Sequence, residues 1–180
     1  TGERLGARGM SNRALRATAL VVALIISAWV FLGWWGSDER RIKRRVKHLQ
    51  KLVTKNIGEG DLGALNRARE ITEIFADPFD FEAEQFDFRS RDRQSLAVGI
   101  HSYRSRAETI GMRVRDWQLD VDKPSRRATL NVTTDFVTSF RDITGREAYR
   151  WQVNWVEQED EWRIDYVRLL EVIEEPSWGF

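Results

Sequence analysis

The sequence predicts an α+β fold in which a single N-terminal transmembrane helix precedes three helices and five strands, in the order ααβαββββ. An uncharged apolar run covers residues 17–37, and apolar residues then recur at helical spacing in two successive spans. The last part of the chain alternates apolar and polar residues in long runs joined by short turns. A curved antiparallel sheet packed on helices would bury the apolar side of these strands.

Four segments are expected along the chain. They are an N-terminal basic segment (1–16), a transmembrane helix (17–37), a soluble domain (38–173) and an aromatic C-terminal tail (174–180).

The run at residues 17–37 is long enough to span a bilayer. About 21 residues at ~1.5 Å rise would cross the ~30 Å hydrocarbon core. A cleaved signal peptide is the alternative, disfavoured by the length of the run and by the lack of a small-x-small cleavage site. Met10 is a candidate initiator. Trp34 and Trp35 would anchor the helix at the interface. Ala19, Ala23 and Ser27 recur every four residues and would permit close helix packing.

The charges are segregated along the chain despite a formal net charge of +1. Residues 1–16 carry +3 and residues 38–55 carry +6, so residues 56–180 must carry −8, because residues 17–37 have no charge. An acidic domain argues against nucleic acid as a partner. The basic span after the membrane segment suits the lipid bilayer, with Arg40 and Arg44 as candidate contacts, although such a face is more often only solvated.

The layout predicts an inner (cytoplasmic) membrane protein. A short basic N-terminus before the apolar run is typical of an uncleaved signal anchor with its N-terminus in the cytoplasm, which would place the domain in the periplasm. The richer positive charge after the run favours the opposite orientation, with a cytoplasmic domain.

Three helices are expected before the main sheet. The first follows Ser37, the second begins at Asp61 and ends at Asp77-Pro78, and the third opens at Ser90. Their expected apolar stripes are Ile42, Val46, Leu49 and Val53; Leu62, Leu65, Ala68, Ile71 and Phe75; and Leu96, Ile100, Tyr103 and Ala107.

Five strands are expected, the first at residues 79–88 with a bulge or bend. The second slips in phase after Val114, and turns at 142–145 and 158–161 separate the later strands. The alternating residues that indicate the last four strands are Ile110, Met112, Val114, Trp117, Leu119 and Val121; Ala128, Leu130, Val132, Thr134 and Phe136; Tyr149, Trp151, Val153 and Trp155; and Trp162, Ile164 and Tyr166, which start the last one.

This order resembles the nuclear transport factor 2-like (cystatin-like, α+β cone) superfamily. EDEWRIDYV at 159–167 looks like the family's terminal strand, and SDERRIKRRVKHLQKLV at 37–53 is similar to the helix after the membrane segment in small bacterial membrane-anchored members. The resemblance implies a fold and not an activity, because the superfamily includes isomerase-like and dehydratase-like enzymes, ligand-binding proteins and periplasmic scaffold subunits of secretion systems.

The residues offer little catalytic chemistry. The chain has no cysteine, and His48 and His101 have no partner at ligand-like spacing, so neither a metal site nor a cofactor is expected. Asp135 is the best candidate base, with Tyr103 and Tyr149 as donors, but its alternation with Thr134 and Phe136 favours an outward side chain.

We therefore expect a non-enzymatic accessory or scaffolding subunit of an inner-membrane protein complex. Its partners would be other subunits of that complex and the bilayer, with a homodimer as a further option. Trp178 and Phe180, in a tail that follows Pro176, are candidate partner or membrane contacts. The alternatives are a tethered binding protein for a small apolar ligand or lipid, and an isomerase or lyase using the pocket of the cone.

Overall fold

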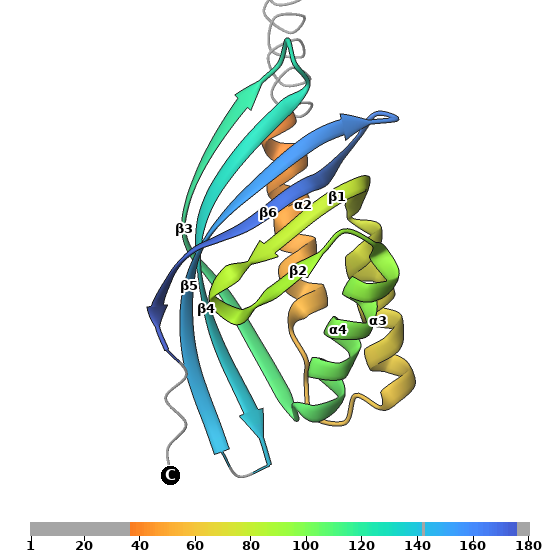
Figure 1. The fold of residues 1–180 in the computed structure, drawn as a ribbon, viewed down its shortest axis with the longest axis vertical. Coiled ribbons are helices and arrows are strands. Elements are labelled where there is room, and N and C mark those ends of the chain that lie inside the picture. Colours follow the sequence, from red (N-terminus) through yellow and green to blue (C-terminus); the bar gives the residue numbers. More distant parts are fainter. Residues whose placement is uncertain (1–36, 142, 176–180) are drawn as a thin grey trace, which may run out of the picture. The chain divides into compact units, whose positions relative to one another are not determined.

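A computed structural model describes residues 37–141 and 143–175 of the chain (Figure 1). Two helices come first, then a short hairpin, a third helix and four long strands. In chain order, the elements are α2 (Asp38–Val53), α3 (Asp61–Glu73), β1 (Phe75–Ala83), the 3-10 helix η1 (Glu84–Phe86), β2 (Phe88–Ser90), α4 (Arg93–Arg106), β3 (Thr109–Asp122), β4 (Arg127–Phe140), β5 (Ile143–Gln158) and β6 (Glu161–Glu174).

The strands form one six-stranded sheet in the order β2-β1-β6-β5-β4-β3. The sheet is curved, and the three helices lie on its concave side (Figure 1). All neighbouring strands are antiparallel except β1 and β6, which pair parallel. The α+β class and the ααβαββββ order are confirmed, with β2 as an additional short strand and the β1–β6 pair as an exception to the expected antiparallel sheet.

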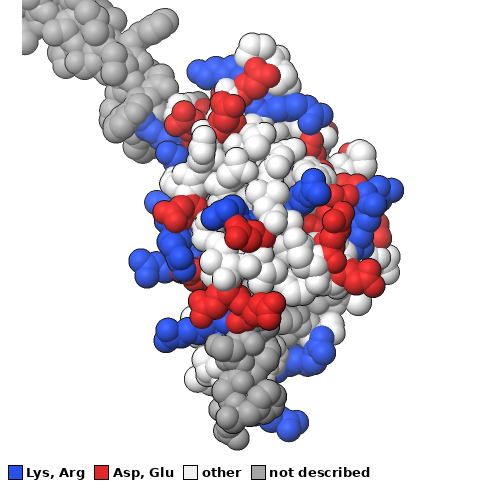
Figure 2. All heavy atoms as spheres, turned by 60° about the vertical axis from the view of Figure 1, so that its left-hand side comes forward, with Lys and Arg blue, Asp and Glu red and all other residues white. Residues whose placement is uncertain are grey.

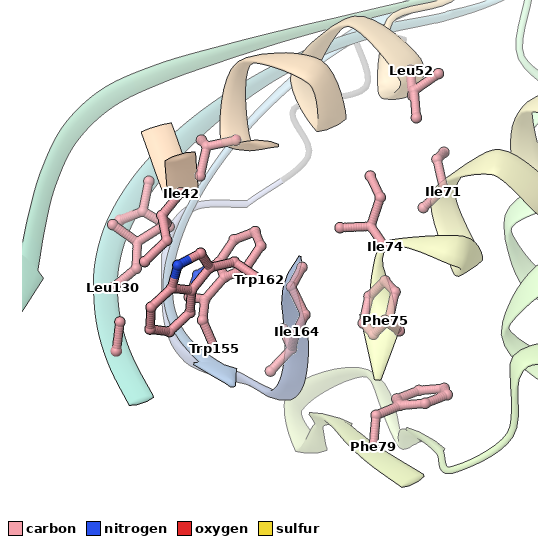
Figure 3. Close-up of a cluster of buried hydrophobic side chains, with 14 of the residues drawn as sticks. Ile42, Leu52, Ile71, Ile74, Phe75, Phe79, Leu130, Trp155, Trp162 and Ile164 are labelled. Atoms are coloured by element: carbon pink, nitrogen blue, oxygen red, sulfur yellow. The ribbon is translucent and has the colours of Figure 1, made fainter. Parts of the chain in front are cut away.

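The core fills the space between α2 and the concave face of the sheet. Trp155 of β5 is fully buried, Trp162 of β6 is 2% exposed, and both belong to a cluster with Ile42 of α2 and Leu130 of β4. Figure 3 shows the two indole rings next to Ile42 and Leu130. The basic helix is therefore part of the domain, because its apolar side contributes to the same core as the sheet.

Several local predictions are confirmed. α2 covers the expected span, and β3 has its register shift between Val114 and Asp116, where the sequence slips in phase. Glu159 and Asp160 both have positive φ and join β5 to β6 in a two-residue turn, as the acidic 158–161 segment predicts.

The second helix and the first strand differ from the prediction. α3 ends at Glu73, and Phe75 begins β1, so Asp77-Pro78 lies within the strand. Leu62, expected in the apolar stripe, is 78% exposed, and Ala64 is buried instead. The physical reason is pairing with β6: Phe75 lies opposite Ile164 in the sheet, and this contact replaces a further helical turn.

Two boundaries also move. The predicted strand at 79–88 is a hairpin in which η1 reverses the chain. Ser90, the predicted start of the third helix, ends β2 instead. Asp92 caps α4, because its Oδ1 accepts a hydrogen bond from the Ser95 backbone N–H at 2.7 Å. The predicted turn at 142–145 is shorter, because β5 already begins at Ile143; Asp142 lies outside the described residues.

The predicted membrane anchor lies almost wholly outside the described residues. Only Ser37 of the 17–37 segment is described, and the basic segment 1–16 is not. Within 37–141 and 143–175, no helix combines the length and the apolar character needed to cross a membrane.

Candidate functional site

Polar and aromatic side chains gather on the concave face of the sheet where β4 and β5 pair. Tyr149 is 6% exposed and packs with Phe136 and Trp151, at ring-centroid distances of 6.0 and 5.8 Å. Glu147 lies two residues before Tyr149 in β5 and therefore on the same face. This is the ionisable side chain that strand alternation brings to the aromatic face.

Hydrogen bonds connect these groups in pairs. The Tyr149 hydroxyl donates to Glu147 Oε2 at 2.6 Å, and the Tyr103 hydroxyl of α4 lies 3.0 Å from Thr138 Oγ1 of β4. We call Tyr103, Thr138, Glu147 and Tyr149 the tyrosine–glutamate cluster. The Tyr149 proton is bound to Glu147, so this phenol can donate to a ligand only by exchanging that bond, whereas its oxygen can still accept a hydrogen bond.

The environment raises the pKa of both phenols in the cluster. Burial is the main cause for Tyr149, and the Glu147 carboxylate adds to it; burial also raises the pKa of Tyr103. Tyr166, whose hydroxyl donates to Glu82 Oε2 at 2.8 Å, has a raised pKa for the same two reasons. All three tyrosines of the chain therefore favour the protonated form in the native state.

This predicts a delayed tyrosine titration. The native chain should show little phenolate absorbance at a pH near 10, where model tyrosine is half ionised. Because the native state retains protons that the unfolded chain loses, stability should fall as the pH rises above about 10. The test is a spectrophotometric titration of the native and the urea-unfolded chain; coincident curves would refute it. Glu147→Gln should lower the raised pKa of Tyr149 part of the way toward the ordinary value of a tyrosine.

Asp135, the predicted candidate base, points away from this cluster. It alternates in β4 with Thr134, which is 2% exposed, and with Phe136, which packs on Tyr149. Arg115 donates to both Asp135 carboxylate oxygens, with Nε 3.2 Å from Oδ2. The expectation of an outward side chain is confirmed, and Asp135 has no role as a base in the concave face.

The two histidines lie elsewhere. His48 is exposed on α2. His101 Nε2 lies 3.0 Å from Asp61 Oδ1 and 3.1 Å from Ser105 Oγ, and Ser105 also donates to Asp61 at 2.7 Å. This is not a catalytic triad, because aspartate and serine contact the same ring nitrogen. It connects the start of α3 to the end of α4.

The predicted contact residues are only partly covered by the structure. Arg40 is partly buried in the first turn of α2, and Arg44 is exposed one turn later. The remaining candidates lie outside the described residues: Ala19, Ala23, Ser27, Trp34, Trp35, Trp178 and Phe180.

The basic charge of α2 is partly neutralised within the domain. Arg41 Nη1 lies 2.7 Å from Glu157 Oε1, and Arg45 Nη2 lies 3.0 Å from Glu161 Oε2, so two arginines pair with acids that flank the β5–β6 turn. The Lys43 ammonium lies 4.7 Å from the centre of the Trp117 ring. Part of the basic charge of residues 38–55 is therefore neutralised by contacts with acidic residues of the same domain.

The outer, convex face of the sheet carries few charges at its centre. Figure 2, which turns this side forward, shows a mostly uncharged area that is interrupted by adjacent blue and red groups and bordered by further ones. Some of the charged side chains around it form pairs, among them Arg127 with Asp165 at 2.9 Å and Arg150 with Glu171 at 2.7 Å. We call five neighbouring uncharged residues on the outward side of β4 and β5 the outer patch: Thr129, Asn131, Gln152, Asn154 and Val156.

Sequence reasoning missed both features, although the pattern contains them. Extending the predicted stripe of Tyr149 and Trp151 back by one step reaches Glu147. The outer patch is part of the outward side of two alternating strands, and its uncharged residues can be recognised in the sequence once those strands are known to be neighbours.

Among the described residues, no group of three His, Cys, Asp or Glu side chains could hold a metal ion. No protein-family model matches the chain, and no curated protein matches it either.

Solved structures do match. A candidate scytalone dehydratase from Novosphingobium aromaticivorans has a TM-score of 0.63 and 11% identity, covering 76% of this chain and 85% of that one. An NTF2-like protein with a cystatin-like fold from the same organism has a TM-score of 0.57 and 14% identity, covering 92% and 93%.

A candidate aromatic ring hydroxylase, also from that organism, has a TM-score of 0.56 and 7% identity over 63% and 80% of the two chains. These similar proteins thus include candidate enzymes, and at such identities the likeness carries the fold alone. The chain has the nuclear transport factor 2-like, cystatin-like fold.

Proposed function

We propose that the chain is a non-enzymatic accessory or scaffolding subunit of an inner-membrane protein complex, held at the bilayer by its predicted N-terminal helix. The observation that carries this proposal is the outer patch. The centres of protein–protein interfaces are depleted in charged residues, and their rims are polar. A sheet face with Thr, Asn and Gln at its centre and paired charges around it fits that description, in a chain of which 32% is charged.

The distribution of ionisable groups supports a non-enzymatic role. Enzymes of this fold need a base or acid directed into the concave face, but Asp135 is turned outward and bound to Arg115. His101 contacts Asp61 between two helices. Glu147 is directed inward, yet its Oε2 already accepts the Tyr149 hydroxyl.

The direct test is to solubilise native membranes in a mild detergent and isolate the chain through a C-terminal tag. We expect other membrane-complex subunits at a fixed ratio to the chain. Recovery of the chain alone would count against the proposal. Deleting residues 176–180 then tests whether the predicted contacts of Trp178 and Phe180 contribute.

Placing a charge in the outer patch should disrupt the complex. Asn131→Arg puts a cation on an exposed position of β4, at the centre of the patch. Burying an unpaired charge costs more than the ~1.4 kcal/mol that corresponds to tenfold in affinity, so recovery of partners should fall at least about tenfold.

The matched control is Asn66→Arg, the same substitution at an exposed position of α3. Both variants should keep the thermal stability of the parent chain, because both side chains are exposed. Equal partner recovery from the two variants would show that the outer patch is not the contact surface.

The tyrosine–glutamate cluster favours a second function. This function is the binding of a small apolar ligand or lipid, or an isomerase or lyase reaction. The cluster combines aromatic rings with a single carboxylate, and such groups orient mostly apolar ligands in proteins. Native mass spectrometry of the purified full chain tests it: a bound small molecule that is lost in Glu147→Gln supports this function, and an empty chain does not.

A further inference from the structure

We propose that the exposed basic stripe of α2, made of Arg44, Lys47, His48 and Lys51, binds a phosphate-bearing anion. The two sources of such a group are the headgroup of an anionic phospholipid and free phosphate. This stripe is a different surface from the outer patch. Only the lipid source rests on the proposed membrane location.

The four side chains form a continuous surface. They are spaced i, i+3, i+4 and i+7, which places them on one side of the helix, and all four are exposed. Arg44 and His48 also line a hollow of about 360 Å³ together with Arg41 and Arg45. This volume lies at the lower end of the range for ligand pockets, about 300–1,000 Å³, and it suffices for a headgroup.

The stripe carries the charge that the domain does not neutralise. Arg41 and Arg45 pair with Glu157 and Glu161. For Arg44, Lys47 and Lys51, by contrast, no carboxylate within the described part of the chain lies in ion-pair distance. An anion can therefore bind these three side chains without displacing a carboxylate from the described part of the chain.

The paired arginines contribute to the site by their orientation. A guanidinium has five N–H donors, and a carboxylate such as Glu157 or Glu161 engages only some of them. Arg41 is held at the β5–β6 turn, because its Nη1 donates to Glu157 and its Nη2 to the Asp160 backbone carbonyl. Glu161 positions Arg45 through Nη2, and a phosphate oxygen in the hollow would bind the other N–H groups of Arg45. Arginine is well suited to this role because its planar donors match the geometry of phosphate.

The charge of the surroundings limits the size of the anion. Residues 56–180 carry −8, so a long polyanion such as a nucleic acid would meet repulsion as soon as it extended beyond α2. A single phosphate group contacts the stripe alone. α2 begins directly after the predicted membrane segment, so the headgroups of anionic lipids are the source nearest to it in the proposed location.

Lysine reactivity provides the test. The full chain is placed in nanodiscs of phosphatidylcholine alone or mixed with phosphatidylglycerol, and an amine-reactive reagent labels it before peptide mass spectrometry. We expect phosphatidylglycerol to slow the labelling of Lys47 and Lys51. Lys123, exposed between β3 and β4, should label equally in both membranes, and Lys55, 6% exposed and bonded to two carbonyl groups, should label in neither.

A matched pair of variants locates the site. Arg44→Gln should raise the phosphatidylglycerol content needed for half-maximal protection about fivefold, the effect expected for one juxtamembrane charge. Arg69→Gln removes one exposed charge from α3 and should change nothing. Added salt should weaken the protection, because the contact is made between exposed charges.

Free phosphate separates the two sources. Protection of Lys47 and Lys51 by inorganic phosphate in a neutral detergent, with no additional effect of phosphatidylglycerol, would assign the stripe to free phosphate. Equal protection by both kinds of nanodisc, or no protection by any anion, would overturn the proposal. None of these results depends on a partner subunit. Anion binding by the stripe can therefore be refuted while the accessory role remains supported, and the accessory role can be refuted while anion binding remains supported.

Discussion

Replacing Arg104 with Met is expected to destabilise the domain by about 3–5 kcal/mol, the usual cost of breaking a buried ion pair by removing one partner. Arg104 of α4 is only 2% exposed. Its Nη2 lies 2.8 Å from both Glu59 carboxylate oxygens, and its Nη1 donates to the backbone carbonyls of Leu52 and Val53 at 2.9 and 2.6 Å.

The cost has two physical components. The Glu59 carboxylate would be left without its buried cation, and the carbonyls at the C-terminal end of α2 would lose the donor that satisfies them. Lys55 reinforces the same region, since its Nζ donates to the carbonyls of Arg104 and Ala107 at 2.7 Å each. The ends of α2 and α4 are thus joined by the side chains of Arg104 and Lys55, which donate to backbone carbonyls that water would otherwise solvate.

Urea denaturation of the full chain in a mild detergent, followed by tryptophan fluorescence, measures this effect. Arg67→Met is the control: Arg67 pairs with Glu70 on the surface of α3, where such pairs contribute little. Glu59→Gln combined with Arg104→Met should be less destabilising than the sum of the two single changes, because neither buried charge then remains alone. Additive effects would contradict the assignment.

Replacing Trp155 with Ala is expected to cost about 3–5 kcal/mol, as for other large-to-small changes in a core. Trp155 of β5 has no exposed surface and packs between α2 and the sheet (Figure 3). Removal of the indole leaves a cavity that cannot collapse easily, because β4 and β6 hold the strand from both sides.

Trp155→Phe separates packing from hydrogen bonding. The Trp155 Nε1 atom is buried and has no hydrogen-bond partner among the described residues. Phe therefore removes volume but no hydrogen bond, and we expect a cost of only about 1–2 kcal/mol. Denaturation curves of the two variants provide the comparison. A Phe variant as unstable as the Ala variant would mean that the indole N–H has an important partner.

Much of the local structure could be predicted from the sequence because it depends on periodicity. The apolar spacing of Ile42 and Val46 placed α2, and the phase slip after Val114 placed the register shift of β3. The alternation of Trp151 and Trp155 placed the inward side of β5. These patterns are local, so each can be recognised before the partner that buries it is known.

Other features depended on contacts between distant segments. Phe75 was expected in a helix and lies in a strand, because β6 offers it a parallel partner about 90 residues later in the chain. Arg104 would be expected at a surface, yet it is buried, because Glu59 and the end of α2 surround it. No window of sequence contains both members of either pair.

The candidate sites divide in the same way. The sequence by itself determined the α+β class, the separation of basic and acidic charge, and the outward side of Asp135, since composition and alternation decide these. Only the tertiary structure decided that Glu147 and Tyr103 belong to one cluster and that two α2 arginines pair with Glu157 and Glu161. The reason is physical: a side chain's partners are set by which helices and strands pack together, and packing is a property of the whole chain.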